Sequence, residues 1–228
     1  MAELIYRTLR ENIADIIRKR IIYQELEGQK IVEQDLAKEF KTSRAPIREA
    51  LRQLENEGLI EYVRNAGCSV KEITLEESFE IYLMRANYET MAVKLMGGNV
   101  PEDTICRMEE VLEKMKKLDE EQFDQVFVYD NQMHGLLVEM TGMTRLYKAW
   151  KELNYGNIVT GFSLSTDKKR VLERQYPIHK ELVDACREKN KEKICHVLSE
   201  HYMRTIRRLL KEQGLSEEDS GFSFDFLV

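Results

Sequence analysis

The stretch that decides the fold reads, from residue 31 to residue 70, IVEQDLAKEF KTSRAPIREA LRQLENEGLI EYVRNAGCSV. Its apolar residues keep helical spacing up to Gly58 and then fall into two short runs, so the pattern is helix, tight turn, helix and β-hairpin. This order is typical of a winged helix-turn-helix, in which the second helix enters the major groove of DNA. The stretch therefore predicts an N-terminal DNA-binding domain.

The second helix of this stretch has one buried face and one exposed face. Its apolar residues recur at i, i+3, i+4 and i+7: Ile47, Ala50, Leu51 and Leu54. Ser43 is a favourable N-cap, and Gly58 supplies the left-handed residue that ends many helices. Arg44 and Arg48 lie one turn apart, away from the apolar face, where arginine can read guanine through two hydrogen bonds.

The residues after Gly58 predict a small hairpin, the wing. Two short runs flank Asn65-Ala66-Gly67, a turn sequence that suits a β-hairpin. The tip is small enough to enter a minor groove, and Arg64 at its shoulder could reach a phosphate or the groove. An alternative is a helical hairpin in an unrelated core, with arginines that are only solvated.

The segment TSRAPIREALRQLENEGLI, residues 42–60, resembles the signature of the GntR family of bacterial transcriptional regulators. The resemblance implies DNA contacts for the residues matching Arg44, Ala45 and Arg48, and a wing glycine at Gly67. Operator binding would need two such domains, so we expect a homodimer on an inverted repeat of double-stranded DNA. The expected DNA-binding residues are Gln34, Ser43, Arg44, Ala45, Arg48, Arg64 and Gly67.

The chain has 228 residues, of which 43% are hydrophobic and 33% charged, a composition typical of globular proteins. No apolar run approaches the roughly 18 residues of a membrane span, and the N-terminus lacks the apolar core of a signal peptide. Four scattered cysteines without a CxxC motif then indicate reduced thiols in a cytoplasm. Basic and acidic residues balance in 1–75, so the whole net charge of −6 falls on the remainder. We expect three segments: a DNA-binding domain at 1–72, a second domain at 73–213 and a tail at 214–228.

From residue 74 onward the pattern is helical, so the fold class we expect is mainly α. Thr74 and Glu77 form a capping box that opens the first helix of this part. Further helices are expected at about 101–115, 120–140, 143–163, 168–188 and 190–212. The second domain is thus predicted to be an all-α bundle of about six helices that also mediates dimerisation.

Asp130 and His134 are four residues apart, so both project from one face of one helix. His179 and His201 lie on two later helices, and this combination is how a helical bundle builds a metal site in its core. Imidazole and carboxylate ligands suit a divalent ion such as Zn, Ni, Fe or Mn. His196 is excluded because it points to another side of the last helix. The alternative is that these side chains only hydrogen-bond within the core or pair on the surface.

The second domain resembles the FCD domain, the effector-binding bundle of one large GntR subfamily. The matching motifs are FVYDNQMHGLLVEMTG, PIHKELVDA and CHVLSEHYMRTI. The resemblance implies that Asp130, His134, His179 and His201 are metal ligands. A small carboxylate or hydroxy-acid effector could fill open metal positions, and Arg85 could hold a second carboxylate. A salt bridge between Arg85 and Glu89 is the alternative.

The function we expect is transcriptional regulation by repression, under the control of a small organic-acid or sugar-acid effector bound at the metal site of the second domain. A metal-sensing regulator is the first alternative. A metal-dependent enzyme is the second, since an open metal position can activate water. The helices around the ligands carry no HExxH-type base, so we do not expect an enzyme. No membrane partner is expected.

Overall fold

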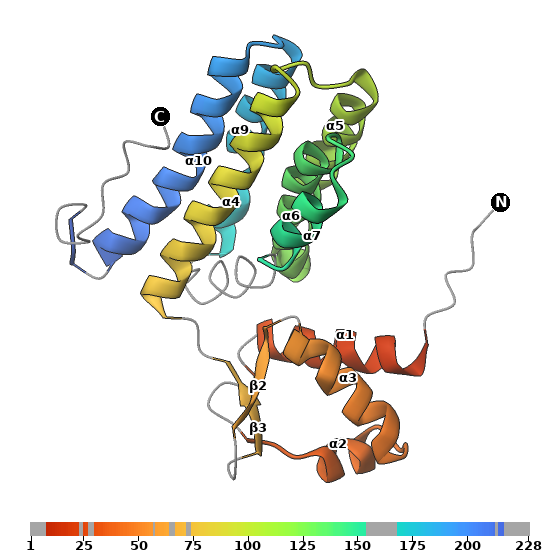
Figure 1. Cartoon of the computed structure of the whole chain (residues 1–228). Coiled ribbons are helices and arrows are strands. Elements are labelled where there is room, and N and C mark those ends of the chain that lie inside the picture. The colour runs from red at the N-terminus through yellow and green to blue at the C-terminus, as the bar shows by residue number, and fades with distance from the viewer. Residues whose placement is uncertain are drawn as a thin grey trace. The chain divides into compact units, whose positions relative to one another are not determined.

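The structure is a computed structural model, and its description covers residues 8–22, 25–26, 30–56, 58–63, 67–71, 74–153, 168–212 and 214–216. The chain divides into two compact units, Met1–Ile73 and Thr74–Val228. Figure 1 shows a small α/β unit joined to a helical bundle. The mainly helical fold class predicted from the sequence is confirmed.

The first unit is a winged helix. Its elements are α1 (Leu9–Ile22), β1 (Lys30–Ile31), α2 (Glu33–Glu39), α3 (Arg44–Asn56), β2 (Ile60–Val63) and β3 (Gly67–Val70). The hairpin of β2 and β3 is the predicted wing. Strand β1 pairs with β3, so the three strands form an antiparallel sheet of order β1-β3-β2. The sequence analysis missed β1, because two residues are too few to show an alternating pattern.

Helix α3 is anchored by the four apolar residues of its predicted buried face, all of which are fully buried. Its C-terminus is closed by a Schellman motif, in which the N–H of Leu59 donates to the carbonyl of Leu54 and that of Gly58 to Glu55. Gly58 has φ +75°, the left-handed conformation expected from the sequence. This closure redirects the chain from the helix into the wing.

The second unit is a helical bundle. Its described helices are α4 (Leu75–Leu95), α5 (Glu102–Lys116), the 3-10 turn η1 (Glu120–Gln122), α6 (Phe123–Glu139), α7 (Thr144–Lys151), α9 (Lys168–Arg187) and α10 (Lys191–Glu212). The predicted capping box opens α4, since Thr74 accepts from the Glu77 N–H and Glu77 accepts from the Thr74 N–H, each at 3.1 Å.

Two expected helices differ from the structure at their ends. The helix expected at 120–140 starts with the 3-10 turn η1, because Asp119 caps the backbone N–H groups of Glu121 and Gln122. The helix expected at 143–163 is α7, which ends at Lys151, and residues 154–167 lie outside the described part. Of the predicted tail at 214–228, only residues 214–216 are described.

Helices α4 and α10 pack along each other in the bundle (Figure 1). Their shared seam is apolar: Phe79, Tyr82, Ala86, Tyr202, Met203, Ile206, Leu209 and Leu210. A second, larger core joins α5, α6, α9 and α10. Together they hold α6, α9 and α10 in fixed register, and these three helices carry the predicted metal ligands. Within the described residues, no helix is long and apolar enough to cross a membrane.

Candidate metal centre and DNA-binding surface

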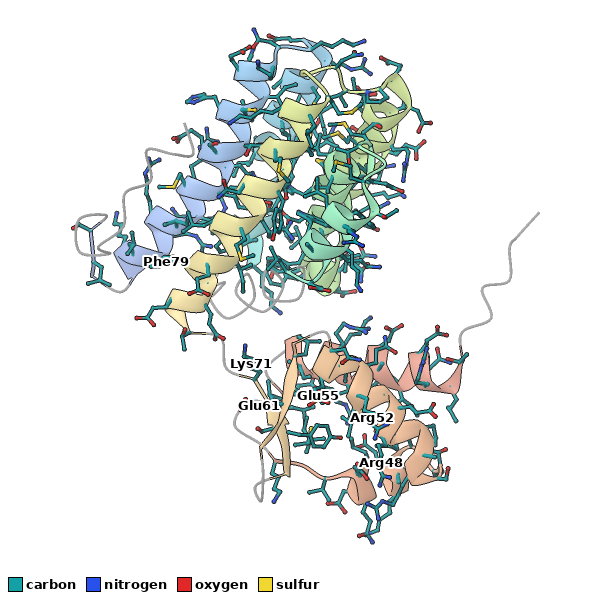
Figure 2. All side chains as sticks on the ribbon, viewed as in Figure 1. Arg48, Arg52, Glu55, Glu61, Lys71 and Phe79 are labelled. Carbon is teal, nitrogen blue, oxygen red and sulfur yellow. The ribbon has the colours of Figure 1, made fainter. Side chains whose placement is uncertain are left out.

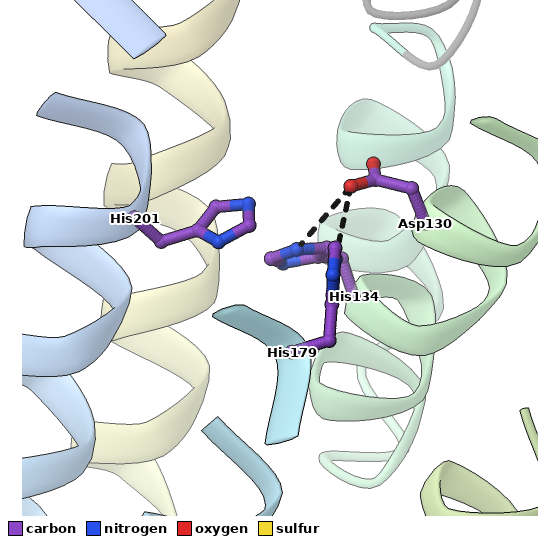
Figure 3. A group of neighbouring side chains, drawn as sticks. All are labelled: Asp130, His134, His179 and His201. Carbon is purple, nitrogen blue, oxygen red and sulfur yellow. Dashed lines mark hydrogen bonds and ion pairs between the residues drawn. The ribbon is translucent and has the colours of Figure 1, made fainter. Parts of the chain in front are cut away.

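The four predicted metal ligands meet in the bundle. Asp130 and His134 come from α6, His179 from α9 and His201 from α10, and their ligand atoms all lie within 4.8 Å of one another. Figure 3 shows the side chains converging on one point. The Asp130 Oδ1 atom is 3.1 Å from Nε2 of His179 and 3.8 Å from Nε2 of His134. Helix packing thus joins residues that are far apart in the sequence.

The partners of two histidines fix which ring nitrogen faces this point. The His134 Nδ1 atom lies 2.6 Å from a Glu89 carboxylate oxygen, and the His179 Nδ1 atom lies 2.8 Å from the carbonyl oxygen of Gln175. Both oxygens are acceptors, so we assign the ring proton to Nδ1 in each case. Both Nε2 lone pairs then face the Asp130 carboxylate, and such groups repel one another unless a cation lies between them.

Two buried histidine nitrogen atoms also indicate that a cation fits between these side chains. The His134 Nε2 and His201 Nδ1 atoms are buried and have no hydrogen-bond partner among the described residues. A buried polar atom without a partner is costly, and a metal ion would offset that cost. One carboxylate and three imidazoles are also a donor set that transition metals prefer. The residues present therefore fit a divalent metal ion.

The electrostatics of the cluster favour an ionised Asp130 and a neutral His201. Burial opposes the protonation of His134, but the charges of Glu89 and Asp130 raise its pKa. Burial alone would raise the pKa of Asp130, but the neighbouring His134 and His179 and the charge of Arg85 hold it well below its usual range. Burial, together with the neighbouring His134 and His179, lowers the pKa of His201 well below its usual value. A metal ion needs both forms, a deprotonated acid and neutral imidazoles.

Glu89 on α4 lies at the centre of the layer behind the ligands. Its Oε1 atom accepts hydrogen bonds from the Trp150 indole at 2.7 Å and from the Tyr202 hydroxyl at 2.6 Å, while its Oε2 atom holds His134. The Glu89 side chain is fully buried. One carboxylate therefore links α4 to α6, α7 and α10.

Arg85 lies one turn before Glu89 and is also fully buried. Its guanidinium donates to Tyr202 at 3.1 Å and to Asn131 at 2.8 Å, and it lies 4.7 Å from the ring centroid of Trp150. It is 3.8 Å from the carboxylates of both Glu89 and Asp130, so the ion pair with Glu89 is present. Asp130 and His201 border a small cavity of about 80 Å³, and Arg85 is not among its lining residues. The proposed contact of Arg85 with an effector stays a prediction.

The predicted DNA-binding face carries a groove of about 780 Å³ in the first unit. It is lined by Lys30, Ile31, Val32, Glu33, Gln34, Arg44, Arg48, Arg52, Glu55, Tyr62, Gly67 and Cys68. Four predicted DNA-binding residues are among them, from α2, α3 and the wing. Figure 2 labels Arg48 and Arg52 on successive turns of α3.

Glu33 orients both arginines of the recognition helix. Arg48 donates from Nε at 3.1 Å and from Nη2 at 2.9 Å to its two carboxylate oxygens, and Arg44 donates from Nη2 at 3.0 Å. The hydrogen bond from Arg48 contributes most to a lowered pKa of Glu33, so the carboxylate stays ionised. The far edge of the Arg48 guanidinium, with Nη1 and one Nη2 hydrogen, is not engaged by Glu33.

The wing glycine has a steric role of its own. Gly67 has φ +96°, and a Cβ atom at this position would lie 2.7 Å from Cε of Lys30. Most side chains would therefore strain the backbone and displace Lys30. Because Cε is near the end of a flexible side chain that can move aside, the positive φ is the main reason that this position favours glycine.

Three predicted DNA-binding residues are not among those that line the groove. Ser43 and Ala45 are exposed at the start of α3 but do not line it, and Arg64 lies outside the described residues. The sequence analysis missed Glu33 as a partner of the arginines. The only signal was an acidic residue at the start of α2, and acidic residues are common in first turns.

Two family profiles match the chain. The profile described as bacterial regulatory proteins, gntR family, matches residues 9–70, and that of the FCD domain matches residues 80–204. The HTH-type transcriptional regulator YdhC of Bacillus subtilis is 32% identical over 56% of this chain and 58% of its own length. The chain thus spans less than two thirds of that relative.

Two relatives described as repressors match more of the chain. The gluconate operon transcriptional repressor of Bacillus licheniformis is 30% identical over 71% of this chain and 66% of its own length. The probable D-xylose utilization operon transcriptional repressor of Paenarthrobacter nicotinovorans is 26% identical over 86% of this chain and 88% of its own.

Solved structures share the fold. Escherichia coli McbR/YncC superposes with a TM-score of 0.70 at 20% identity, over 91% of this chain and 100% of that one. A GntR regulator from Rhodococcus sp. RHA1 gives a TM-score of 0.70 at 20% identity, over 89% of this chain and 97% of that one.

Proposed function

Because the chain belongs to the GntR family of bacterial regulatory proteins and carries an FCD domain, we propose that it is a homodimeric repressor controlled by a small acid. The dimer binds an inverted-repeat operator, and the acid binds at a divalent metal ion in the helical bundle. The family and the relatives are transcriptional regulators rather than enzymes. A regulator of this kind works where the bacterial chromosome is, in the cytoplasm.

The observation that carries the DNA-binding proposal is the fixed arginine pair on α3. An arginine whose Nε edge is held by a carboxylate has lost side-chain freedom before it meets DNA. Its far edge still offers two parallel N–H groups, which match the O6 and N7 acceptors of guanine. Arg48 is therefore the main base-reading residue, with Arg44 beside it, and Lys30 and the wing contribute phosphate or groove contacts.

The metal proposal rests on the cluster of Asp130, His134, His179 and His201. These four residues would hold the ion, which supplies a positive centre with positions left open for a carboxylate. The proposal of an acid as effector is supported by one relative, whose operon is named for gluconate, a sugar acid. The operon of the other relative is named for D-xylose, a neutral sugar.

The bundle offers a surface for a second copy of the chain. Met84, Met91 and Leu95 lie on α4 with side chains 42%, 41% and 56% exposed. Their spacing of seven and four residues places them on one stripe of the helix. Exposed apolar stripes of this kind mark interaction surfaces, and self-association along α4 would cover this one.

Helix α4 is also the element through which an effector would act on DNA binding. It begins at Leu75, directly after the winged-helix unit, and its Glu89 is bonded to the metal ligand His134. Asp130, His134, His179 and His201 would hold the ion, and a ligand that bound to it would displace His134 and, through the contact at 2.6 Å, Glu89. We therefore expect α4 to shift between two packings, with a coupling free energy of about 1–3 kcal/mol.

Operator selection tests the proposal. Operator sequences would be selected from random DNA with the full-length protein, and affinities measured by fluorescence anisotropy at fixed salt concentration. Arg48→Ala should lose about 1–3 kcal/mol of operator binding, while Arg187→Ala, an exposed arginine of the second unit, should bind as the unchanged protein does. Selection of no defined sequence, or equal operator affinity in the two variants, would refute the assignment.

Metal titration separates the two forms of regulation. An effector-controlled repressor keeps its operator affinity when zinc is added and changes it only when an acid is added as well. A metal sensor would respond to zinc alone.

A further inference from the structure

The groove of the first unit carries more positive charge than the unit as a whole. Basic and acidic residues balance in this part of the chain, but four cations line the groove against two carboxylates. Two of the cations, Arg44 and Arg48, share the carboxylate of Glu33. The other two are Lys30 on β1 and Arg52 on α3, and both are exposed. The groove is therefore a local excess of positive charge on a neutral unit.

Lys30 and Arg52 differ from most cations of this unit, because their side chains have no carboxylate partner within the described residues. Four others are paired: Arg10 with Glu11, Arg18 with Asp15, Arg20 with Glu39 and Lys38 with Asp35. Lys41 also lacks such a partner in the described part of the chain, but it does not line the groove. In the groove, the positive charge that no carboxylate offsets lies on Lys30 and Arg52.

Arg52 continues the row of the two arginines that are proposed to read bases. Arg44, Arg48 and Arg52 are spaced by four residues, so they follow one another along one face of α3, and Figure 2 labels the last two. Eight residues span about 12 Å of helix axis, and the major groove of DNA is about 12 Å wide. A recognition helix contacts base edges with its N-terminal residues. Arg52 then lies at the rim of the major groove, where the phosphates are.

Lys30 reaches the same groove from the wing. Its side chain lies along Gly67 of β3, since a Cβ atom at Gly67 would be 2.7 Å from the Lys30 Cε atom and 3.4 Å from its Nζ atom. Strand β1 pairs with β3, so this ammonium group is carried by the sheet and not by the recognition helix. The two cations without a carboxylate partner thus approach the groove from two different elements.

We propose that Arg52 and Lys30 bind phosphate groups of the DNA backbone and supply the part of the affinity that does not depend on DNA sequence. The inference rests on the proposed function and divides the DNA-binding surface into two kinds of cation. Base reading needs an arginine of fixed orientation, which Glu33 provides, whereas a phosphate contact needs chiefly a positive charge. The Glu33 carboxylate also offsets one of the two charges on Arg44 and Arg48. Sequence-independent attraction therefore falls to Arg52 and Lys30.

The test measures how DNA affinity depends on salt. The full-length protein would be titrated by fluorescence anisotropy with the selected operator and with a random-sequence duplex of equal length, at about 50 to 200 mM salt. Each phosphate contact contributes about 0.9 to the slope of log affinity against log salt concentration. In a dimer, Arg52→Ala and Lys30→Ala should each reduce the slope by about 1.8 on both duplexes. The ratio of operator to random-DNA affinity should stay unchanged.

Three further variants separate charge from position. Arg52→Lys keeps the charge and should retain most of the slope. Arg10→Ala removes an exposed charge of α1 that does not line the groove, and its slope should be close to that of the unchanged protein. Arg48→Ala should lower the ratio of operator to random-DNA affinity. All of these side chains are exposed, so scanning calorimetry should show nearly the same Tm in every variant.

Three outcomes would overturn the inference. An unchanged slope in Arg52→Ala or Lys30→Ala would remove that residue from the phosphate contacts. A fall in the affinity ratio, as in Arg48→Ala, would make it a reader of bases. An equal change of slope in Arg10→Ala would trace the effect to the overall charge of the unit. The slope on random DNA needs no operator, so failure of the proposed function shows separately, as an unchanged ratio in Arg48→Ala.

Discussion

Replacing Glu89 by glutamine should switch the tautomer of a metal ligand. In Glu89→Gln the amide oxygen can take the place of Oε1 and still accept from Trp150 and Tyr202, which both donate to that atom. The amide NH₂ then faces the Nδ1 atom of His134, which must become an acceptor. The ring proton moves to Nε2, the atom aimed at the metal, and ligation is blocked.

We expect Glu89→Gln to lower both the metal affinity and the stability of the protein. Loss of a group that orients a metal ligand typically costs about 10- to 100-fold in metal affinity. The change also removes a charge 3.8 Å from the fully buried Arg85. Breaking a buried ion pair lowers the free energy of unfolding by about 3–5 kcal/mol. We expect a loss of about 3 kcal/mol, because Asp130 lies equally close to Arg85 and still balances part of its charge. For a chain of this length, Tm should fall by roughly 6–12 °C.

Zinc affinity would be measured by competition with a chromophoric chelator and Tm by scanning calorimetry. Trp150 is the single tryptophan of the chain and donates a hydrogen bond to Glu89. Its fluorescence therefore reports on the substitution at this carboxylate. Glu139→Gln is the matched control, since Glu139 lies on α6 and pairs with Arg107 at 3.0 Å on the surface. It should change neither property appreciably. A zinc affinity of Glu89→Gln within twofold of the unchanged protein would show that Glu89 does not set the tautomer.

Four further predictions concern metal, DNA and assembly. His134→Ala should bind little metal by elemental analysis, keep its operator affinity and lose the response to acids; an intact response would contradict the metal-linked mechanism. If the free metal is present at about 1,000 times its Kd, its removal by a chelator should lower the free energy of unfolding by about 4 kcal/mol. Calorimetry should then show a fall in Tm of roughly 8–16 °C. Glu33→Gln should reduce the ratio of operator to random-DNA affinity by about tenfold in anisotropy titrations, since Arg48 is no longer held. Leu95→Asp should shift a dimer to a monomer in analytical ultracentrifugation, and an unchanged dimer would exclude the α4 stripe.

Local patterns were enough to predict much of this protein. The i, i+3, i+4, i+7 spacing from Ile47 to Leu54 predicted the buried face of α3, and Gly58 predicted its end. The Thr74–Glu77 capping box predicted the start of α4. Each signal lies within one or two helical turns, where covalent geometry alone decides which side chains share a face. The Asp130–His134 pair belongs to the same class.

Contacts between distant elements could not be predicted in this way. Glu89 meets His134, Trp150 and Tyr202 across sequence separations of 45, 61 and 113 residues. Nothing in the local sequence distinguishes this glutamate from those that pair on the surface. The two-residue strand β1 likewise exists only because β3 is there to receive it.

The sequence by itself predicted the residues that we propose carry the chemistry: two arginines at the start of α3, and one aspartate and three histidines in the bundle. Only the tertiary structure decided how those residues are held. Glu33 holds the arginines, and Glu89 holds His134, one of the proposed metal ligands. The reason is that helical periodicity is set by neighbours in the chain. The register between helices, in contrast, depends on the packing of many side chains from distant segments at once.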